Sequence, residues 1–222
     1  MDTDIHILKT KGGVVEFLHS YMDFETESDD QMVVYSLVLI ARQRENPSVT
    51  YNSEIVFSEI VTDSDNIERK VEKLWTLGEN YHAPDHDTNP KFRLYCSVNN
   101  RDVQSAVFDF QQEMNHINEE IYNGNHQMLE KNARLDSLWN HTLQKDTSRH
   151  SRDFLIDVDE TDEDVLSYLV EQFEDVTTVY DIIESPNGYH LITESFGFPQ
   201  YDFYDEYDVE VKTDDLVFLT MI

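Results

Sequence analysis

The final third of the chain contains a succession of elements that limits the possible folds more than any other feature. A buried strand is followed by a helix and then by two strands that Ser185-Pro186-Asn187-Gly188 joins, a segment typical of a hairpin turn. Strand, helix, hairpin and final strand predict a small sheet with helices on one face, an α+β arrangement. The pattern places the strand at 153–159, the helix from Thr161 to about Phe173, the hairpin strands at 176–184 and 189–194, and a closing strand within 209–222.

The preceding residues predict a second α/β unit. Asn46-Pro47 marks a hairpin turn, and Asp63, Ser64 and Asp65 are candidates for a helix N-cap. The pattern indicates helices at 14–22, 67–80 and 103–122, and strands at 32–42, 51–61 and 92–98. We predict an N-terminal α/β unit over 1–122, a connecting helical arm over 123–152 and a third segment over 153–222, together forming one compact domain.

Length and composition are those of a folded protein. Of the 222 residues, 39% are hydrophobic and 12% aromatic, which is enough for a real core. The sequence has no apolar run long enough to span a membrane, and its first residues lack the basic start and apolar block of a signal peptide. We expect a cytoplasmic protein with no membrane partner. The single cysteine, Cys96, excludes an internal disulfide and a cysteine-rich zinc site.

A formal net charge of −30 restricts the possible partners. The 46 Asp and Glu residues outnumber the 16 Lys and Arg residues and would repel a phosphate backbone at long range. From Asp153 onward, Lys212 is the only Lys or Arg. Contact with DNA or RNA must therefore be local and assisted by a metal or a basic partner protein. The same charge is also compatible with a solvated surface, or with a non-enzymatic DNA mimic that inhibits a nucleic-acid-binding partner.

Two carboxylates at the end of the predicted strand are the strongest candidates for chemistry. Alternate residues of a strand share a face, so Asp157 and Asp159 point the same way and are spaced to hold one divalent cation. With a third acid they would hold Mg²⁺ or Mn²⁺, which neutralises a triphosphate during displacement at its α-phosphate. His190 is expected near this pair, to donate to a phosphate oxygen or to orient a ligand. The third acid stays open among Glu210, Asp214 and Asp215.

Two turns are candidates for nucleotide binding. Asn99 and Arg101 lie in the polar turn between a predicted strand and a predicted helix, where anions commonly bind, and Arg93 lies in that strand. Arg93 and Arg101 have a simpler alternative, which is to pair with the abundant acids. The second turn contributes Ser185, Asn187 and Gly188, and its glycine would let the backbone approach a nucleotide closely.

The order of these motifs resembles that of the archaeo-eukaryotic primase superfamily, the primase-polymerases. That family carries an hhhDhD strand, a later SxH-type hairpin and a third acidic strand in an RRM-like unit that follows an α/β unit; here 154–159 and 185–190 match the first two. The resemblance implies an RRM-like unit over 153–222, a metal site at Asp157 and Asp159, and a nucleotide contact at His190. It implies a small, divergent nucleotidyltransferase of phage or mobile-element type that adds nucleotides from nucleoside triphosphates to a nucleic-acid strand.

Three other interpretations stay open. Residues 157–161 also match the DxDxT motif of haloacid-dehalogenase-type phosphatases, although too few residues follow for that fold. The second alternative is the acidic DNA mimic, and the third is an inactive member of the primase fold that serves as a binding module. For an enzyme, we expect Asp157→Ala to abolish nucleotidyl transfer and leave the fold intact, whereas the change would be silent in a DNA mimic.

Overall fold

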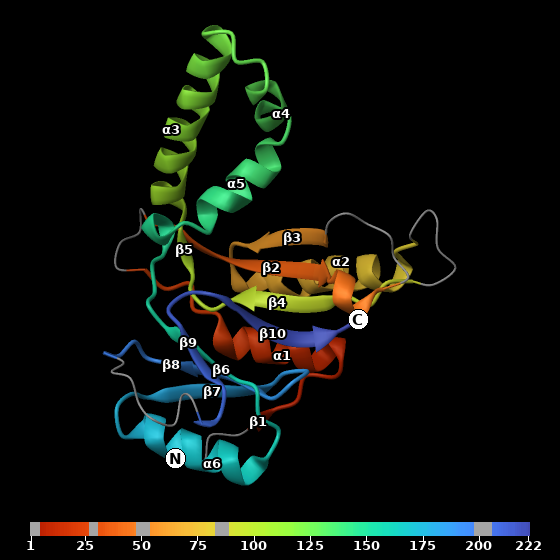
Figure 1. The fold of residues 1–222 in the computed structure, drawn as a ribbon, viewed down its shortest axis with the longest axis vertical. Coiled ribbons are helices and arrows are strands. Elements are labelled where there is room, and N and C mark those ends of the chain that lie inside the picture. Colours follow the sequence, from red (N-terminus) through yellow and green to blue (C-terminus); the bar gives the residue numbers. More distant parts are fainter. Residues whose placement is uncertain (1–4, 27–30, 48–53, 83–88, 198–205) are drawn as a thin grey trace. The chain divides into compact units, whose positions relative to one another are not determined.

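The computed structural model describes residues 5–26, 31–47, 54–82, 89–197 and 206–222 (Figure 1). Its contacts divide the chain into two compact units. The first unit comprises Met1–Asp23, Tyr35–Asn99 and Arg152–Ile222, and the second comprises Phe24–Val34 and Asn100–Ser151. The structure is of the mixed α+β class, as the sequence predicts. No helix among the described residues is long and apolar enough to cross a membrane.

The described elements follow one another in an order close to the predicted one. The first half contains β1 (Ile5–His6), α1 (Lys11–Tyr21), β2 (Val33–Ala41), η1 (Gln43–Glu45), β3 (Ile55–Val61), η2 (Ser64–Asn66), α2 (Ile67–Asn80), β4 (Arg93–Ser97), β5 (Arg101–Asp102) and α3 (Val103–Tyr122). The second half contains α4 (Met128–Asn132), α5 (Leu135–Leu143), η3 (Asp146–Ser148), β6 (Phe154–Val158), α6 (Glu163–Glu174), β7 (Val179–Glu184), β8 (Tyr189–Thr193), β9 (Val209–Lys212) and β10 (Leu216–Met221).

One sheet of the first unit has the strand order β1-β7-β8-β6-β9. Strands β7 and β8 form the predicted antiparallel hairpin, and β6 pairs antiparallel with both β8 and β9. Alternate residues of β6, Ile156 and Val158, are buried against Leu169 and Phe173 of α6, which lies beneath the sheet in Figure 1. The opposite face of β6 is therefore the one that carries Asp157.

The other sheet has the order β10-β4-β2-β3, and β2 and β3 form an antiparallel pair. The predicted strand at 51–61 is confirmed from Ile55, and residues 51–53 lie outside the described residues. The N-cap prediction for α2 is wrong, because 64–66 form the η2 turn and Asn66 precedes the helix without a side-chain cap. The single closing strand is also corrected: 209–222 contain β9 and β10, which belong to different sheets.

The second unit is mainly helical. Asp102 caps α3 by accepting hydrogen bonds from the backbone N–H groups of Gln104 (2.8 Å) and Ser105 (3.0 Å). Helices α4 and α5 return alongside α3 in Figure 1. The observed units therefore differ from the predicted segments, because α3 is grouped with the helices that follow it, and 35–99 are grouped with 152–222.

Candidate functional site

The centre of the candidate site is Asp157 on the exposed face of β6. Its Cα partners are His190 on β8 and Glu210 on β9. Directly opposite residues of paired strands point to the same face, so the three side chains form a row across the sheet. The sequence expectation that His190 lies near the carboxylate pair is thereby met for Asp157.

The carboxylate of Asp157 accepts hydrogen bonds from two side chains that flank it. Its Oδ2 is 2.8 Å from the Nζ of Lys212, and its Oδ1 is 3.3 Å from the Nε2 of His190. Burial acts to raise the pKa of Asp157, but the contacts with His190 and Lys212 outweigh it and hold the pKa well below its usual value. Asp157 is therefore a carboxylate at neutral pH.

Backbone contacts define how His190 is oriented. Its Nδ1 is 3.1 Å from the backbone nitrogen of Phe218, a group that can only donate. Nδ1 must therefore be the acceptor, and the ring proton of the neutral imidazole lies on Nε2. That proton points toward the Oδ1 of Asp157. Strand β10 of one sheet thus fixes a side chain of the other.

Lys212 lies among three carboxylates. Besides Asp157, its Nζ is 3.3 Å from the Oδ2 of Asp215 and 3.5 Å from the Oε2 of Glu210. The Lys212 side chain is 25% exposed. Burial acts to lower the pKa of Lys212, but the hydrogen bond to Asp157 and the neighbouring negative charges raise it above its usual value. The only Lys or Arg after Arg152 is therefore used inside the site.

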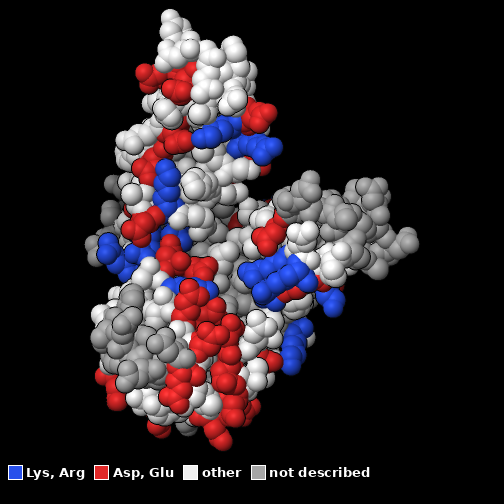
Figure 2. Space-filling view, in the orientation of Figure 1, with Lys and Arg blue, Asp and Glu red and all other residues white. Residues whose placement is uncertain are grey.

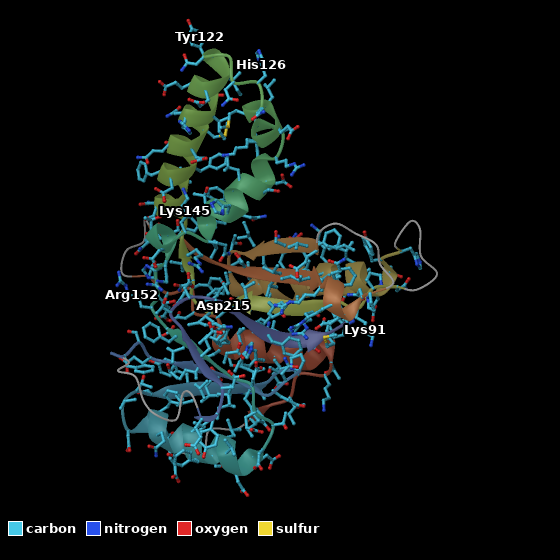
Figure 3. All side chains as sticks on the ribbon, in the orientation of Figure 1. Lys91, Tyr122, His126, Lys145, Arg152 and Asp215 are labelled. Atoms are coloured by element: carbon cyan, nitrogen blue, oxygen red, sulfur yellow. The ribbon has the colours of Figure 1, made fainter. Side chains whose placement is uncertain are left out.

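A polar cavity of about 190 Å³ opens over this face of β6. Its acidic side chains are those of Asp157, Asp159 and Asp215, the last labelled in Figure 3. Three arginines on the segments of β2, η1 and β4 also line it: Arg42, Arg44 and Arg93. Figure 2 shows Lys and Arg side chains gathered near η1, beside a broad acidic surface. The cavity therefore combines carboxylates from one sheet with guanidinium groups from the other.

Two of these arginines, Arg93 and Arg42, contact other side chains of the protein. Arg93 donates from its Nε to the Oε2 of Glu45 at 3.0 Å, and its guanidinium also pairs with the other oxygen of that carboxylate. The guanidinium carbon of Arg42 lies 5.5 Å from the centre of the Tyr95 ring. Arg44 is exposed, and its one contact with an acid in the described part of the chain is with Glu45 at 4.0 Å. Arg44 is therefore the most available of the three for an anion.

The turn between β7 and β8 forms another wall of the cavity. Ser185 and Asn187 line it, and the Oγ of Ser185 accepts from the backbone N–H of Gly188 at 3.2 Å. A Cβ at Gly188 would lie 2.0 Å from the backbone oxygen of Val158 and 2.7 Å from the nitrogen of Glu160. The glycine that we expected to approach a nucleotide instead brings the turn against the end of β6.

Three predicted site residues have other surroundings. Asn99 is buried and donates to the backbone oxygen of Asp153 (3.0 Å) and to the Oδ1 of Asp214 (3.1 Å). Arg101 is buried in the second unit and donates to the Oε1 of Gln144 at 3.1 Å. None of Asn99, Arg101 and Asp214 lines the polar cavity, so we leave them out of the site proposed below.

The sequence did not identify Lys212, Arg42 and Arg44 as site residues. Lys212 had a usable signal, since it is the only Lys or Arg in the last 70 residues, from Asp153 to Ile222. Arg42 and Arg44 had none, because they reach the cavity only through the packing of one sheet beside the other.

Replacing Lys212 should lower stability in a pH-dependent way. We expect Lys212→Gln to reduce the free energy of unfolding by about 1–2 kcal/mol at pH 7, because three carboxylates lose their shared cation. The lowered pKa of Asp157 means that this contribution is lost as pH falls below about 4, and the raised pKa of Lys212 means that it persists until pH rises above about 10. Urea unfolding of both proteins across this range measures the difference.

Lys9→Gln is the matched control, because Lys9 is exposed and has a 3.9 Å contact with Glu184 alone in the described residues. Equal losses of stability in the two variants would contradict the account of Lys212.

Comparison with known proteins found no family model, curated protein or solved structure that matches the chain. Within the described ranges, no group of three or more His, Cys, Asp or Glu side chains is arranged to hold a metal ion.

Proposed function

We propose that the chain is a metal-dependent nucleotidyltransferase that resembles the primase-polymerases and adds nucleotides from nucleoside triphosphates to a DNA or RNA strand. One observation carries the proposal: the carboxylates Asp157 and Asp159 share a cavity with the guanidinium groups of Arg42, Arg44 and Arg93. Such a cavity has groups for a cation on one side and for a polyanion on the other, and a metal-bound triphosphate contains both charges.

The oxygen donors of the cavity fit Mg²⁺ or Mn²⁺ in chemical type. Asp157 and Asp159 would hold the ion. The candidates for the third acid are Asp215, which lines the same cavity, and Glu210, which is outside the cavity lining but lies directly opposite Asp157 on β9. Glu210 is 72% exposed and its partner in the described residues is Lys212, whereas Asp215 also accepts the backbone N–H of Leu216. The bound ion would neutralise the phosphates during displacement at the α-phosphate.

The protein side chains would bind and orient the triphosphate. Arg44, which is the least engaged arginine, would contact the terminal phosphates, and Arg93 would add charge from the cavity wall. The Nε2–H of His190 is a donor beside Asp157 and would reach a phosphate oxygen once the ligand is bound. Lys212 would keep Asp157, Glu210 and Asp215 close together, which limits their mutual repulsion.

The acceptor strand would need help to bind. The broad acidic surface that Figure 2 shows would repel a polyanion. We therefore expect a basic partner protein to deliver the DNA or RNA strand, and the cavity itself to recognise the nucleoside triphosphate.

Removal of one arginine should weaken binding of the triphosphate. We expect Arg44→Gln to lower the affinity for a nucleoside triphosphate about five- to tenfold at low ionic strength and less at high salt, because a screened charge contact is lost. Equilibrium dialysis with a labelled nucleoside triphosphate and Mn²⁺, at low and at high salt, measures this affinity. Arg69→Gln, which removes the same charge from exposed Arg69 on α2, is the control. Equal affinities for Arg44→Gln and the wild type would count against the proposed phosphate site.

A further inference from the structure

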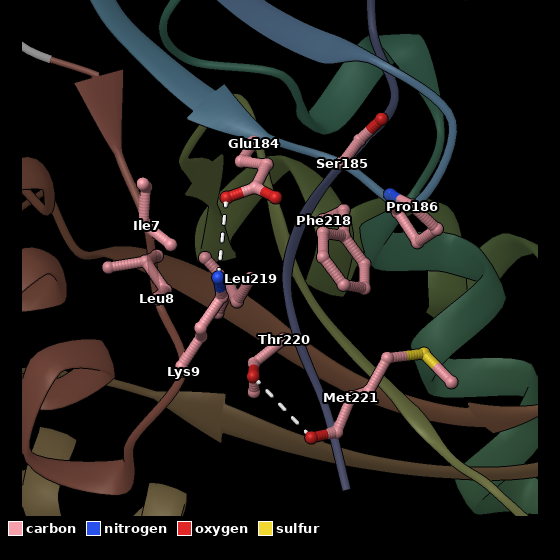
Figure 4. Close-up of a pocket in the computed structure, with 10 residues that line it drawn as sticks. All are labelled: Ile7, Leu8, Lys9, Glu184, Ser185, Pro186, Phe218, Leu219, Thr220 and Met221. Atoms are coloured by element: carbon pink, nitrogen blue, oxygen red, sulfur yellow. Dashed lines mark hydrogen bonds and ion pairs between the residues drawn. The ribbon is translucent and has the colours of Figure 1, made fainter. Parts of the chain in front are cut away.

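An apolar cavity lies beside the polar one. Its volume is about 280 Å³, and Figure 4 shows it between the segment after β1, the end of β7 and strand β10. Lys9 and Glu184, which also line it, form a 3.9 Å ion pair that Figure 4 marks with a dashed line. Six of its ten lining residues have apolar side chains: Ile7, Leu8, Pro186, Phe218, Leu219 and Met221.

The two cavities share part of their walls. Ser185, Pro186 and Phe218 line both of them. The shared residues come from the β7–β8 turn and from β10, the strand whose backbone also orients His190. A ligand with an anionic end and an apolar end could therefore extend from one cavity into the other around Pro186 and Phe218.

We infer that the apolar cavity receives the base of the nucleoside triphosphate whose phosphates occupy the polar cavity; this inference rests on the proposed function. A nucleobase has two flat faces that pack well against aromatic and aliphatic side chains. The ring of Phe218 and the side chains of Pro186 and Met221, which line the cavity in Figure 4, would supply such contacts. The polar side chains that line the cavity are those of Lys9, Glu184, Ser185 and Thr220, and Lys9 and Glu184 pair with each other. The apolar side chains therefore provide most of the contacts that a base would make.

This arrangement predicts that the base adds affinity through contact area and the phosphates add it through charge. The two contributions can be separated because inorganic tripolyphosphate has the charge of a nucleoside triphosphate but no base. A change in the apolar cavity should affect only the ligand that carries a base.

A double variant, Ile7→Ser with Met221→Ser, tests the inference. The two side chains are 55% and 40% exposed, so their replacement leaves the core intact. Calorimetric titrations with Mn²⁺ would use each of the four ribonucleoside triphosphates and inorganic tripolyphosphate as ligands. We expect about tenfold weaker binding of each nucleoside triphosphate by the variant, and unchanged binding of tripolyphosphate. Val56→Ser, at a 53% exposed position on β3, is the control and should change neither affinity.

Unchanged affinity of the double variant for the nucleoside triphosphates would overturn the inference and leave the proposed function standing. The same loss of affinity for tripolyphosphate as for the nucleoside triphosphates would also overturn it, because the apolar cavity would then not be specific for the base. If the wild type bound neither ligand, the proposed function itself would fail and the inference with it.

Discussion

Asp157→Asn should reduce nucleotidyl transfer about a thousandfold, which is the largest effect on activity that we expect from any single substitution. The asparagine keeps an oxygen that can accept a hydrogen bond from Lys212, but it lacks the negative charge that would hold the metal. Incorporation of a labelled nucleotide into an acceptor strand, with Mn²⁺ and increasing enzyme, measures the rate. Asp164→Asn is the control, because Asp164 is exposed on α6 and lies outside the cavity.

The same substitution separates the proposed enzyme from the acidic DNA mimic. A mimic depends on many charges spread over its surface, so the loss of one carboxylate in a cavity should leave its activity unchanged. Wild-type rates of transfer in Asp157→Asn would therefore refute the role of Asp157. The structure also bears on Asp157→Ala, which we expected to leave the fold intact. Because Lys212 and His190 both contact Asp157, alanine would remove their shared acceptor and should destabilise the protein.

Gly188→Ala should destabilise the first unit by about 3 kcal/mol or more, the largest effect on stability that we expect. The added Cβ would lie 2.0 Å from the backbone oxygen of Val158. A backbone atom cannot move aside as the end of a flexible side chain can, so the β7–β8 turn would have to shift away from the end of β6. Thermal and urea unfolding measure the loss.

Gly12→Ala is the matched control for Gly188→Ala. Gly12 lies in α1, and a Cβ at this position would meet no atom within 4 Å. Alanine favours a helix more than glycine does, so this variant should be as stable as the wild type or slightly more stable. Similar stabilities of Gly188→Ala and Gly12→Ala would show that the turn does not need its glycine for close approach.

Local patterns predicted the helices well. Ile67, Val71 and Leu74 recur at helical spacing, and all three are buried in α2, whose bounds match the predicted ones. The bounds of α3 also match, and Asp102 caps its start. These features depend on residues that are near one another in the sequence, which is why the sequence alone was sufficient.

Pairing between distant segments was harder to predict. Strands β9 and β10 are only a few residues apart, yet they join different sheets. Alternation of apolar residues predicts a strand but does not identify the sheet that it joins. The division into units has the same origin, because α3 begins only a few residues after β4 of the first unit but packs with α4 and α5.

The candidate site combines features that the sequence predicts with contacts that it does not predict. The spacing of Asp157 and Asp159 and the Ser185–His190 segment were visible in the sequence, and the structure brings Asp157, Asp159 and His190 to one cavity. The contact of Lys212 with Asp157 depends on the register of β6 and β9, where Lys212 is opposite Leu155. No local pattern predicts that register.

Titration calorimetry with Mn²⁺ and a nucleoside triphosphate tests the central claim most directly. The wild type and an Asp157→Asn/Asp159→Asn double variant would be compared, after thermal unfolding has shown that both are folded. We predict saturable, metal-dependent binding of the nucleotide by the wild type and its loss in the double variant. Absence of binding by the folded wild type, or equal binding by the two proteins, would contradict a metal–nucleotide site at the end of β6.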